Sequence, residues 1–176
     1  MIPDATVERY YYIFDSRERR PLVMDRQTGA EVNWAAAPRV QLIDYVTERT
    51  STAVLRKFAR WCARQVGVET VPSETPTGRL WTAAQRGEEE WAHVRAETID
   101  AVVEAVVLDL SRRKVEAARL LTAHACTHPD PRQAAIGAAH MSERVAEFSA
   151  KTAPEEAVRE RRQQQIDWLL DELGKA

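Results

Sequence analysis

Two stretches of the chain place imidazole and carboxylate side chains at intervals of about one helical turn, so that they would share a helix face. The first stretch contains His93, Glu97, Asp100 and Glu104, and the second contains His140, Glu143 and Glu147. If the two faces met, they could bind a divalent metal ion, as helical-bundle metal proteins do. The alternative, which we favour, is that both are solvated outer faces of amphipathic helices, and we therefore expect no cofactor.

A third group of potential metal ligands is the segment from His124 through Cys126 to His128. A helix would place the two histidines on one face and the cysteine on another. Structural zinc sites usually have a fourth ligand and a Cys-x₂-Cys type of spacing, which this segment lacks. We therefore expect Cys126 in the core and the histidines near the end of a helix, where its carbonyl groups favour a positive charge.

A basic face is predicted on a helix over about Thr52–Val66, opposite an apolar arc that includes Phe58 and Cys62. Its members are Arg56, Lys57, Arg60 and Arg64. Such a row could follow a phosphate backbone, dock an acidic protein partner or be a solvated face balanced by acidic neighbours. Because the formal net charge is -2, the chain has no general attraction to nucleic acid, and we prefer an acidic protein partner to nucleic acid.

Motifs of nucleophilic catalysis and phosphate binding are missing from the sequence. It contains no G-x-S-x-G elbow, and its six glycines are scattered at the ends of predicted elements instead of forming a phosphate loop. We therefore predict no catalytic residues and a protein that is not an enzyme.

Composition indicates a globular protein of one domain. The 176 residues are 44% hydrophobic and 30% charged, and no apolar run approaches the ~20 residues that cross a bilayer. The first residues, MIPDATVERY, lack the layout of a signal peptide, and two cysteines are too few for a disulfide framework. We expect free thiols, a cytoplasmic location and no membrane association.

The elements that must position these groups change character along the chain. Residues 1–34 are rich in aromatic and β-favouring side chains and predict an antiparallel meander, with a tight turn at Asp25–Gly29. From residue 35 to residue 176 the apolar period is helical. We therefore predict a mainly α fold: an up-down bundle of six or seven helices with a small N-terminal β element packed on it.

The predicted helices have start and stop signals in the sequence. After Thr52–Val66 a short helix ends at Gly87, Asp130-Pro131 begins a helix that runs to about Lys151, and Pro154 begins the last one. The remaining predictions are helices over about Pro38–Arg49, Glu88–Arg112 and Val115–Thr127. The apolar arcs predict a core that contains Phe58, Trp91, Val102, Val106, Phe148 and Leu169.

The order of motifs from Val54 to Gly174 resembles small all-helical bacterial putative immunity proteins. The similarity consists of the segment LRKFARWCARQV at 55–66, the short Leu80–Gly87 segment, the Ala-rich helices and the final QIDWLL at 165–170, and it leaves the β-like N-terminus unmatched. The resemblance implies a cytosolic, non-enzymatic binder that neutralises or scaffolds a partner protein, and it carries over no functional residue.

Three functions therefore remain open from the sequence. The function that we prefer is a non-enzymatic protein-interaction module that binds a partner protein as an immunity protein or antitoxin does. The second is a nucleic-acid-associated protein, related to DNA damage or stress, that binds through the basic face. The third is a helical metal-dependent hydrolase, which would require His93 and His140 to converge.

Overall fold

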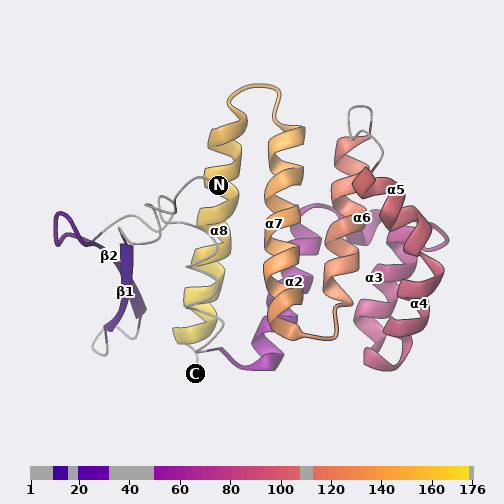
Figure 1. Cartoon of the computed structure of the whole chain (residues 1–176), viewed down its shortest axis with the longest axis horizontal. Helices are drawn as coiled ribbons and strands as arrows, with labels where there is room; N and C mark the ends of the chain where they lie inside the picture. The colour runs from indigo at the N-terminus through magenta and orange to yellow at the C-terminus, as the bar shows by residue number, and fades with distance from the viewer. Residues whose placement is uncertain (1–9, 16–19, 32–49, 108–112, 175–176) are drawn as a thin grey trace.

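The computed structural model describes residues 10–15, 20–31, 50–107 and 113–174, and this part of the chain is mainly helical. The prediction of a mainly α fold is confirmed. Seven α-helices, labelled α2 to α8, lie within the described ranges (Figure 1). The helix predicted over about Pro38–Arg49 lies outside the described residues. No described helix is long and apolar enough to cross a membrane.

The N-terminal part contains an antiparallel pair of strands, β1 (Tyr10–Asp15) and β2 (Arg20–Asp25), with Tyr10 opposite Asp25. A turn follows β2 where the sequence predicts one. Gly29 adopts a φ of 66° and its N–H donates to the carbonyl of Asp25 at 2.7 Å, while the Asp25 side chain accepts from the N–H of Gln27 at 2.8 Å. Glycine is favoured here because it adopts a positive φ without steric cost.

Side chains cap the starts of three helices. The starts of α2 and α7 lie where the sequence predicts them, whereas the short helix expected from about Gly78 begins two residues earlier, at Pro76. The Ser51 side chain accepts from the N–H of Val54 at the start of α2 (Thr52–Gln65), and Thr75 does so from Gly78 at the start of α3 (Pro76–Arg86). Asp130 accepts from two backbone N–H groups at the start of α7 (Pro131–Ser149). Each cap supplies an acceptor to a terminal N–H group that has no partner within the helix.

The prediction of a single long helix over Glu88–Arg112 is wrong. The described part of that range divides into the 3₁₀ turn η3 (Glu88–Glu90), α4 (Trp91–Glu97) and α5 (Ile99–Val107). The break is Thr98, whose φ and ψ are −101° and 3° and whose hydroxyl donates to the carbonyl of Val94 at 2.7 Å. Such a bond from a threonine side chain to the preceding turn competes with the helix backbone and bends it.

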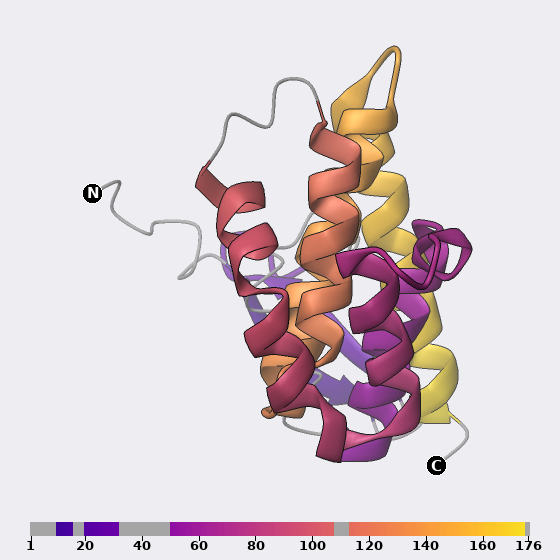
Figure 2. The ribbon, with the colours of Figure 1, turned by 90° about the vertical axis from the view of Figure 1, so that its right-hand side faces the viewer.

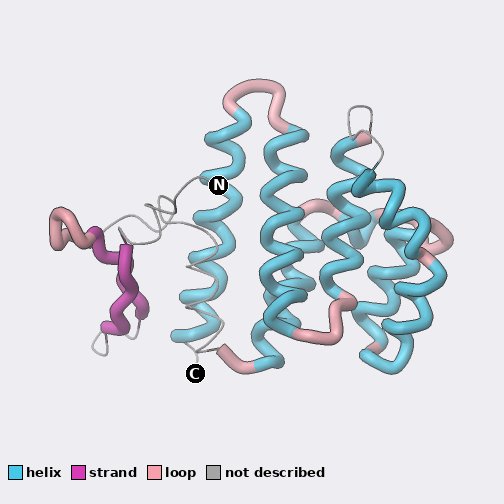
Figure 3. The backbone as a smooth tube through the Cα atoms, in the orientation of Figure 1, coloured by secondary structure: helices cyan, strands magenta, loops and turns pink. Residues whose placement is uncertain are grey.

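The helices pack around α7, which contacts α2, α6 (Lys114–Cys126) and α8 (Pro154–Gly174), as Figures 1 and 2 show. On its other side α6 contacts α3, the 3₁₀ turn η2 (Val68–Thr70) and α5. The two strands lie at the edge of the molecule beside α8 (Figure 3). The side chains on the inner faces of α7 are small, which lets the neighbouring helices approach closely. Four of them are alanines with no exposed surface: Ala134, Ala135, Ala138 and Ala139.

The predicted core is confirmed at four positions and wrong at one. Phe58, Trp91, Val102 and Leu169 are buried, and Phe148 is partly buried and packs against the core. Val106, in contrast, is 62% exposed. Apart from Asp100 and Glu104 its helix α5 is apolar, and the packing against α6 uses the face of Val102, one turn earlier.

Candidate functional site

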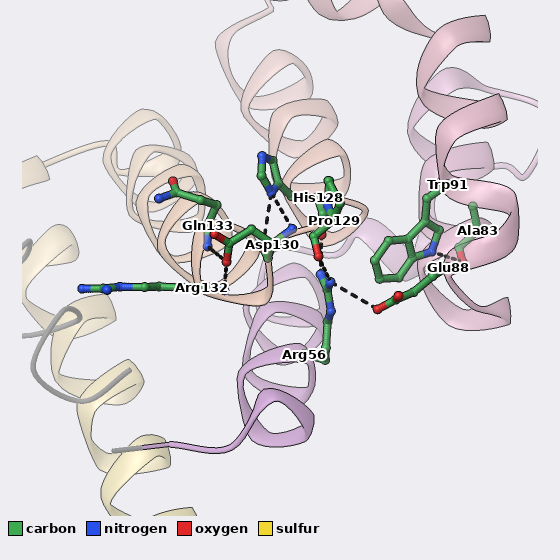
Figure 4. A network of polar contacts seen from close by, with 9 residues as sticks. All are labelled: Arg56, Ala83, Glu88, Trp91, His128, Pro129, Asp130, Arg132 and Gln133. Atoms are coloured by element: carbon green, nitrogen blue, oxygen red, sulfur yellow. Dashed lines mark hydrogen bonds and ion pairs between the residues drawn. The ribbon is translucent and has the colours of Figure 1, made fainter. Parts of the chain in front are cut away.

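The first residue of the predicted basic face is buried. Only 8% of Arg56 is exposed, and its guanidinium group donates to the carbonyls of His128 and Pro129 and to a carboxylate oxygen of Glu88 at 3.3 Å (Figure 4). The prediction that Arg56 belongs to a solvent-facing stripe is therefore wrong. Its position on the helical wheel is as expected, but the loop after α6 folds over it and supplies two backbone carbonyls as acceptors.

Arg56 joins elements that are far apart in the sequence. Its Cζ lies 4.4 Å from the ring centroid of Trp91, and the indole Nε1 donates to the carbonyl of Ala83 at 2.8 Å. Burial lowers the pKa of Arg56, and the carboxylate of Glu88 acts in the opposite direction. The contacts connect α2 with α3, with the start of α4 and with the loop between α6 and α7. Arg56 therefore holds these segments of the fold together.

The other members of the predicted basic face are more open, but two of them are paired. The Lys57 Nζ lies 2.9 Å from a carboxylate oxygen of Glu172 on α8. The Arg64 Nε lies 3.7 Å from Glu69, and its Cζ is 5.9 Å from the ring centroid of Trp81. Arg60 is half-buried. Because Arg56 is buried, only Lys57, Arg60 and Arg64 could contact a phosphate backbone. Two of these three cations already have an acidic partner within the protein.

The predicted metal ligands fall into separate surroundings. The His93 side chain is 76% exposed and its Nε2 lies 3.2 Å from Glu97, while Asp100 is exposed beyond the Thr98 break. On α7, His140 is exposed, but Glu143 is buried and lies 3.4 Å from the Arg162 guanidinium of α8. Within the described ranges no group of three His, Cys, Asp or Glu residues could hold a metal ion.

The segment His124–His128 matches the expectation for its cysteine. Cys126 is buried, and its Sγ donates to the carbonyl of Ala59 on α2 at 3.3 Å. Burial raises the pKa of the Cys126 thiol to about 12, and it also raises the pKa of Cys62 well above its ordinary value. Because a thiolate is the reactive form of cysteine, both side chains behave as core residues and not as nucleophiles.

His124 lies in the last turn of α6 and has lost much of its basicity. Burial, with smaller contributions from the positive charges of Arg95 and His128, lowers its pKa to about 4. Arg95 donates to the His124 carbonyl at 2.8 Å, so this helix end already has a cation. His124 is therefore neutral at physiological pH. It does not supply the positive charge that the sequence led us to expect at this helix end.

A small cavity of about 250 Å³ lies between α7 and α8. Its lining includes the small side chains of Ala146, Ala150 and Ala157 together with Glu160 and Arg161. The Arg161 guanidinium also donates to the carbonyl of Gln65 at 3.4 Å, which directs one of its nitrogens towards α2. Since the wall carries one carboxylate and one cation, the cavity offers no net charge with which to select an ionic small molecule.

One surface feature is absent from the sequence-based predictions. Three large apolar side chains of α5 are exposed at one-turn intervals: Ile99 by 47%, Val103 by 50% and Val106 by 62%. We call these three residues the α5 stripe. On another face of the same helix Val102 is buried and Ala101 and Ala105 pack against the core. The sequence signal was present, because apolar residues cover most of the circumference of α5, which exceeds what a single neighbour can cover.

Comparison with known proteins identifies no relative for this chain. No family model, no curated protein and no solved structure matches it.

Proposed function

We propose that this chain is a non-enzymatic protein-interaction module and that the α5 stripe is the surface it presents to its partner. The observation that carries the proposal is the exposure of Ile99, Val103 and Val106 on one helix face. Single exposed apolar residues are ordinary, but a contiguous apolar patch bordered by polar residues is typical of a protein-binding surface. The scaffold that we assign to the module is an up-down helical bundle with an N-terminal β element.

Other features support a binding role over a catalytic one. The two thiols are buried and weakly acidic, and the histidines and carboxylates of the two predicted stripes lie in separate environments. The resemblance to small helical immunity proteins, which bind and neutralise a partner protein, agrees with this role. We do not assign the partner to the basic face, because Arg56 is buried and both Lys57 and Arg64 have acidic neighbours.

Site-specific photo-crosslinking in cells that express the chain tests the proposal. A photoreactive phenylalanine replaces Val103, and in the matched control it replaces Glu155, an exposed residue of the first turn of α8. We expect one protein adduct that forms from position 103 and not from position 155. The purified adduct partner should then bind the wild-type chain at least about tenfold more tightly than Val103→Asp, a difference of about 1.4 kcal/mol.

The substitution itself should leave the fold intact, because exposed positions tolerate polar side chains within about 0.5 kcal/mol. An unchanged circular dichroism spectrum and melting temperature of Val103→Asp provide that control. Equal adducts from both positions, or equal affinity of Val103→Asp and wild type, would remove the α5 stripe as the binding surface.

A further inference from the structure

We infer that the partner covers the α5 stripe with an amphipathic helix whose apolar row is flanked by lysine or arginine. This inference rests on the proposed function and adds to it the chemistry of the partner. Two observations carry it: the dimensions of the stripe, and the charges beside it.

The dimensions fit a helix. Ile99 and Val106 are seven residues apart, which at about 1.5 Å per residue makes the stripe ~10 Å long. The three members occupy positions i, i+4 and i+7, the same pattern by which an amphipathic helix presents its anchors. A partner helix lying along α5 could therefore place an apolar side chain against each of them.

The charged residues of α5 itself are all negative. Asp100 and Glu104 follow the α5 stripe on the next face of the helix, both are exposed, and the helix sequence IDAVVEAVV contains no lysine or arginine. Among the described residues neither carboxylate is part of an ion pair. Two cations lie at the start of α6. The Lys114 Nζ lies 5.4 Å from the ring centroid of Phe148 on α7. Arg113 is exposed but forms no ion pair with Asp100 or Glu104. The rim of Asp100 and Glu104 is thus left for a cation from outside.

This rim discriminates among occupants. A second copy of the chain would bring two further carboxylates and no cation from its own α5, and like charges placed together oppose association. A partner that presents lysine or arginine gains the opposite interaction, and its approach is accelerated by the same field. Because the rim is exposed, the attraction should weaken as salt rises.

Two designed peptides test the inference. Both are constrained to be helical and carry the same leucine row, but the first has lysines beside the row and the second has glutamates. Fluorescence anisotropy at low and at physiological salt measures their binding to the full chain. We expect the lysine peptide to bind at least about tenfold more tightly than the glutamate peptide at low salt, and this preference to shrink as salt rises.

Charge reversal on the protein provides the decisive comparison. The double variant Asp100→Lys/Glu104→Lys should prefer the glutamate peptide. The matched control Glu155→Lys/Glu156→Lys makes the same change in charge at exposed positions of α8, and it should keep the preference for the lysine peptide.

The outcomes separate the inference from the proposed function. If Val103→Asp abolishes binding of both peptides while charge reversal at positions 100 and 104 leaves the preference unchanged, the stripe is a binding surface and the basic partner is wrong. If Val103→Asp changes neither affinity, both are wrong. A concentration-dependent dimer of the free chain that Val103→Asp dissociates, measured by sedimentation velocity, would identify a second copy as the occupant and overturn the inference.

Discussion

The guanidinium group of Arg56 lies over the indole ring of Trp91, with its Cζ 4.4 Å from the ring centroid, although 35 positions separate the two residues in the sequence. The ring in turn donates to the carbonyl of Ala83, and the guanidinium donates to the carbonyls of His128 and Pro129 in the loop between α6 and α7. A cation stacked on an aromatic face and bonded to several acceptors at once holds four segments in one arrangement.

Arg56→Ala should destabilise the fold by about 2–4 kcal/mol, because it removes the charged donor of the part-buried carbonyls of His128 and Pro129, and a hydrogen bond to a charged group contributes about 1.5–3 kcal/mol. Arg56→Lys should recover only part of the loss, since one ammonium cannot reproduce a planar fork of donors. Urea unfolding measures both. Lys57→Ala, which removes an exposed ion pair on the same helix, should cost at most about 1 kcal/mol. Equal losses of unfolding free energy in Arg56→Ala and Lys57→Ala would contradict this stabilising role of Arg56.

Two valines one turn apart on α5 provide a matched pair. Val102 is 7% exposed and Val106 is 62% exposed. Val102→Ala should lower the free energy of unfolding by about 1–3 kcal/mol through lost burial and a residual cavity. Val106→Ala should change it by no more than about 0.5 kcal/mol. Denaturant titration of the two variants decides, and a larger loss at position 106 would show that the face of α5 assigned to solvent is buried.

Gly78→Ala should destabilise the protein even though alanine is the better helix former by about 1 kcal/mol. A Cβ at this position would lie 2.1 Å from the backbone oxygen of Pro72, so the loop before α3 would have to move. Overpacking of this kind costs about 1–3 kcal/mol. Thermal unfolding measures the effect, and Gln85→Ala at an exposed position of the same helix is the control. A higher melting temperature for Gly78→Ala would refute this close approach.

Stability should fall as the pH drops from about 6.5 to about 4, in part because of His124. Its pKa is about 4 in the folded chain and near 6.5 in the unfolded chain, so the unfolded state binds more protons in this window. The contribution is therefore complete above the unfolded pKa and is lost as acid protonates the unfolded state. Unfolding midpoints across this range should show a shallower slope for His124→Gln. Identical slopes in this variant and the wild type would contradict the buried neutral imidazole.

Several local features of the fold could be predicted from the sequence because their causes are local. Ser51 and Asp130 accept from backbone N–H groups two or three residues away, and Gly29 meets a turn conformation that other residues adopt only at a cost. The apolar arc of α2 is also a local property, and it placed Phe58 and Cys62 correctly in the core.

The errors concern residues whose environment comes from distant segments. On a helical wheel Arg56 lies opposite Phe58, and such a position is exposed unless another part of the chain covers it. Here the loop at residues 127–130 and the ring of Trp91 cover it. In the same way Glu143 belongs to a row of polar residues on its own helix but is buried against α8.

The sequence by itself determined where most helices begin and end, which side of α2 is apolar, and that Cys126 lies in the core. Only the tertiary structure decided which side of α5 packs against α6 and which side carries Ile99, Val103 and Val106 into solvent. The physical reason is that α5 is apolar over most of its circumference, so its sequence contains no preference between the side of Val102 and the side of Val106. Burial is then assigned by the neighbours that reach it, and the apolar surface that no neighbour covers becomes available for binding.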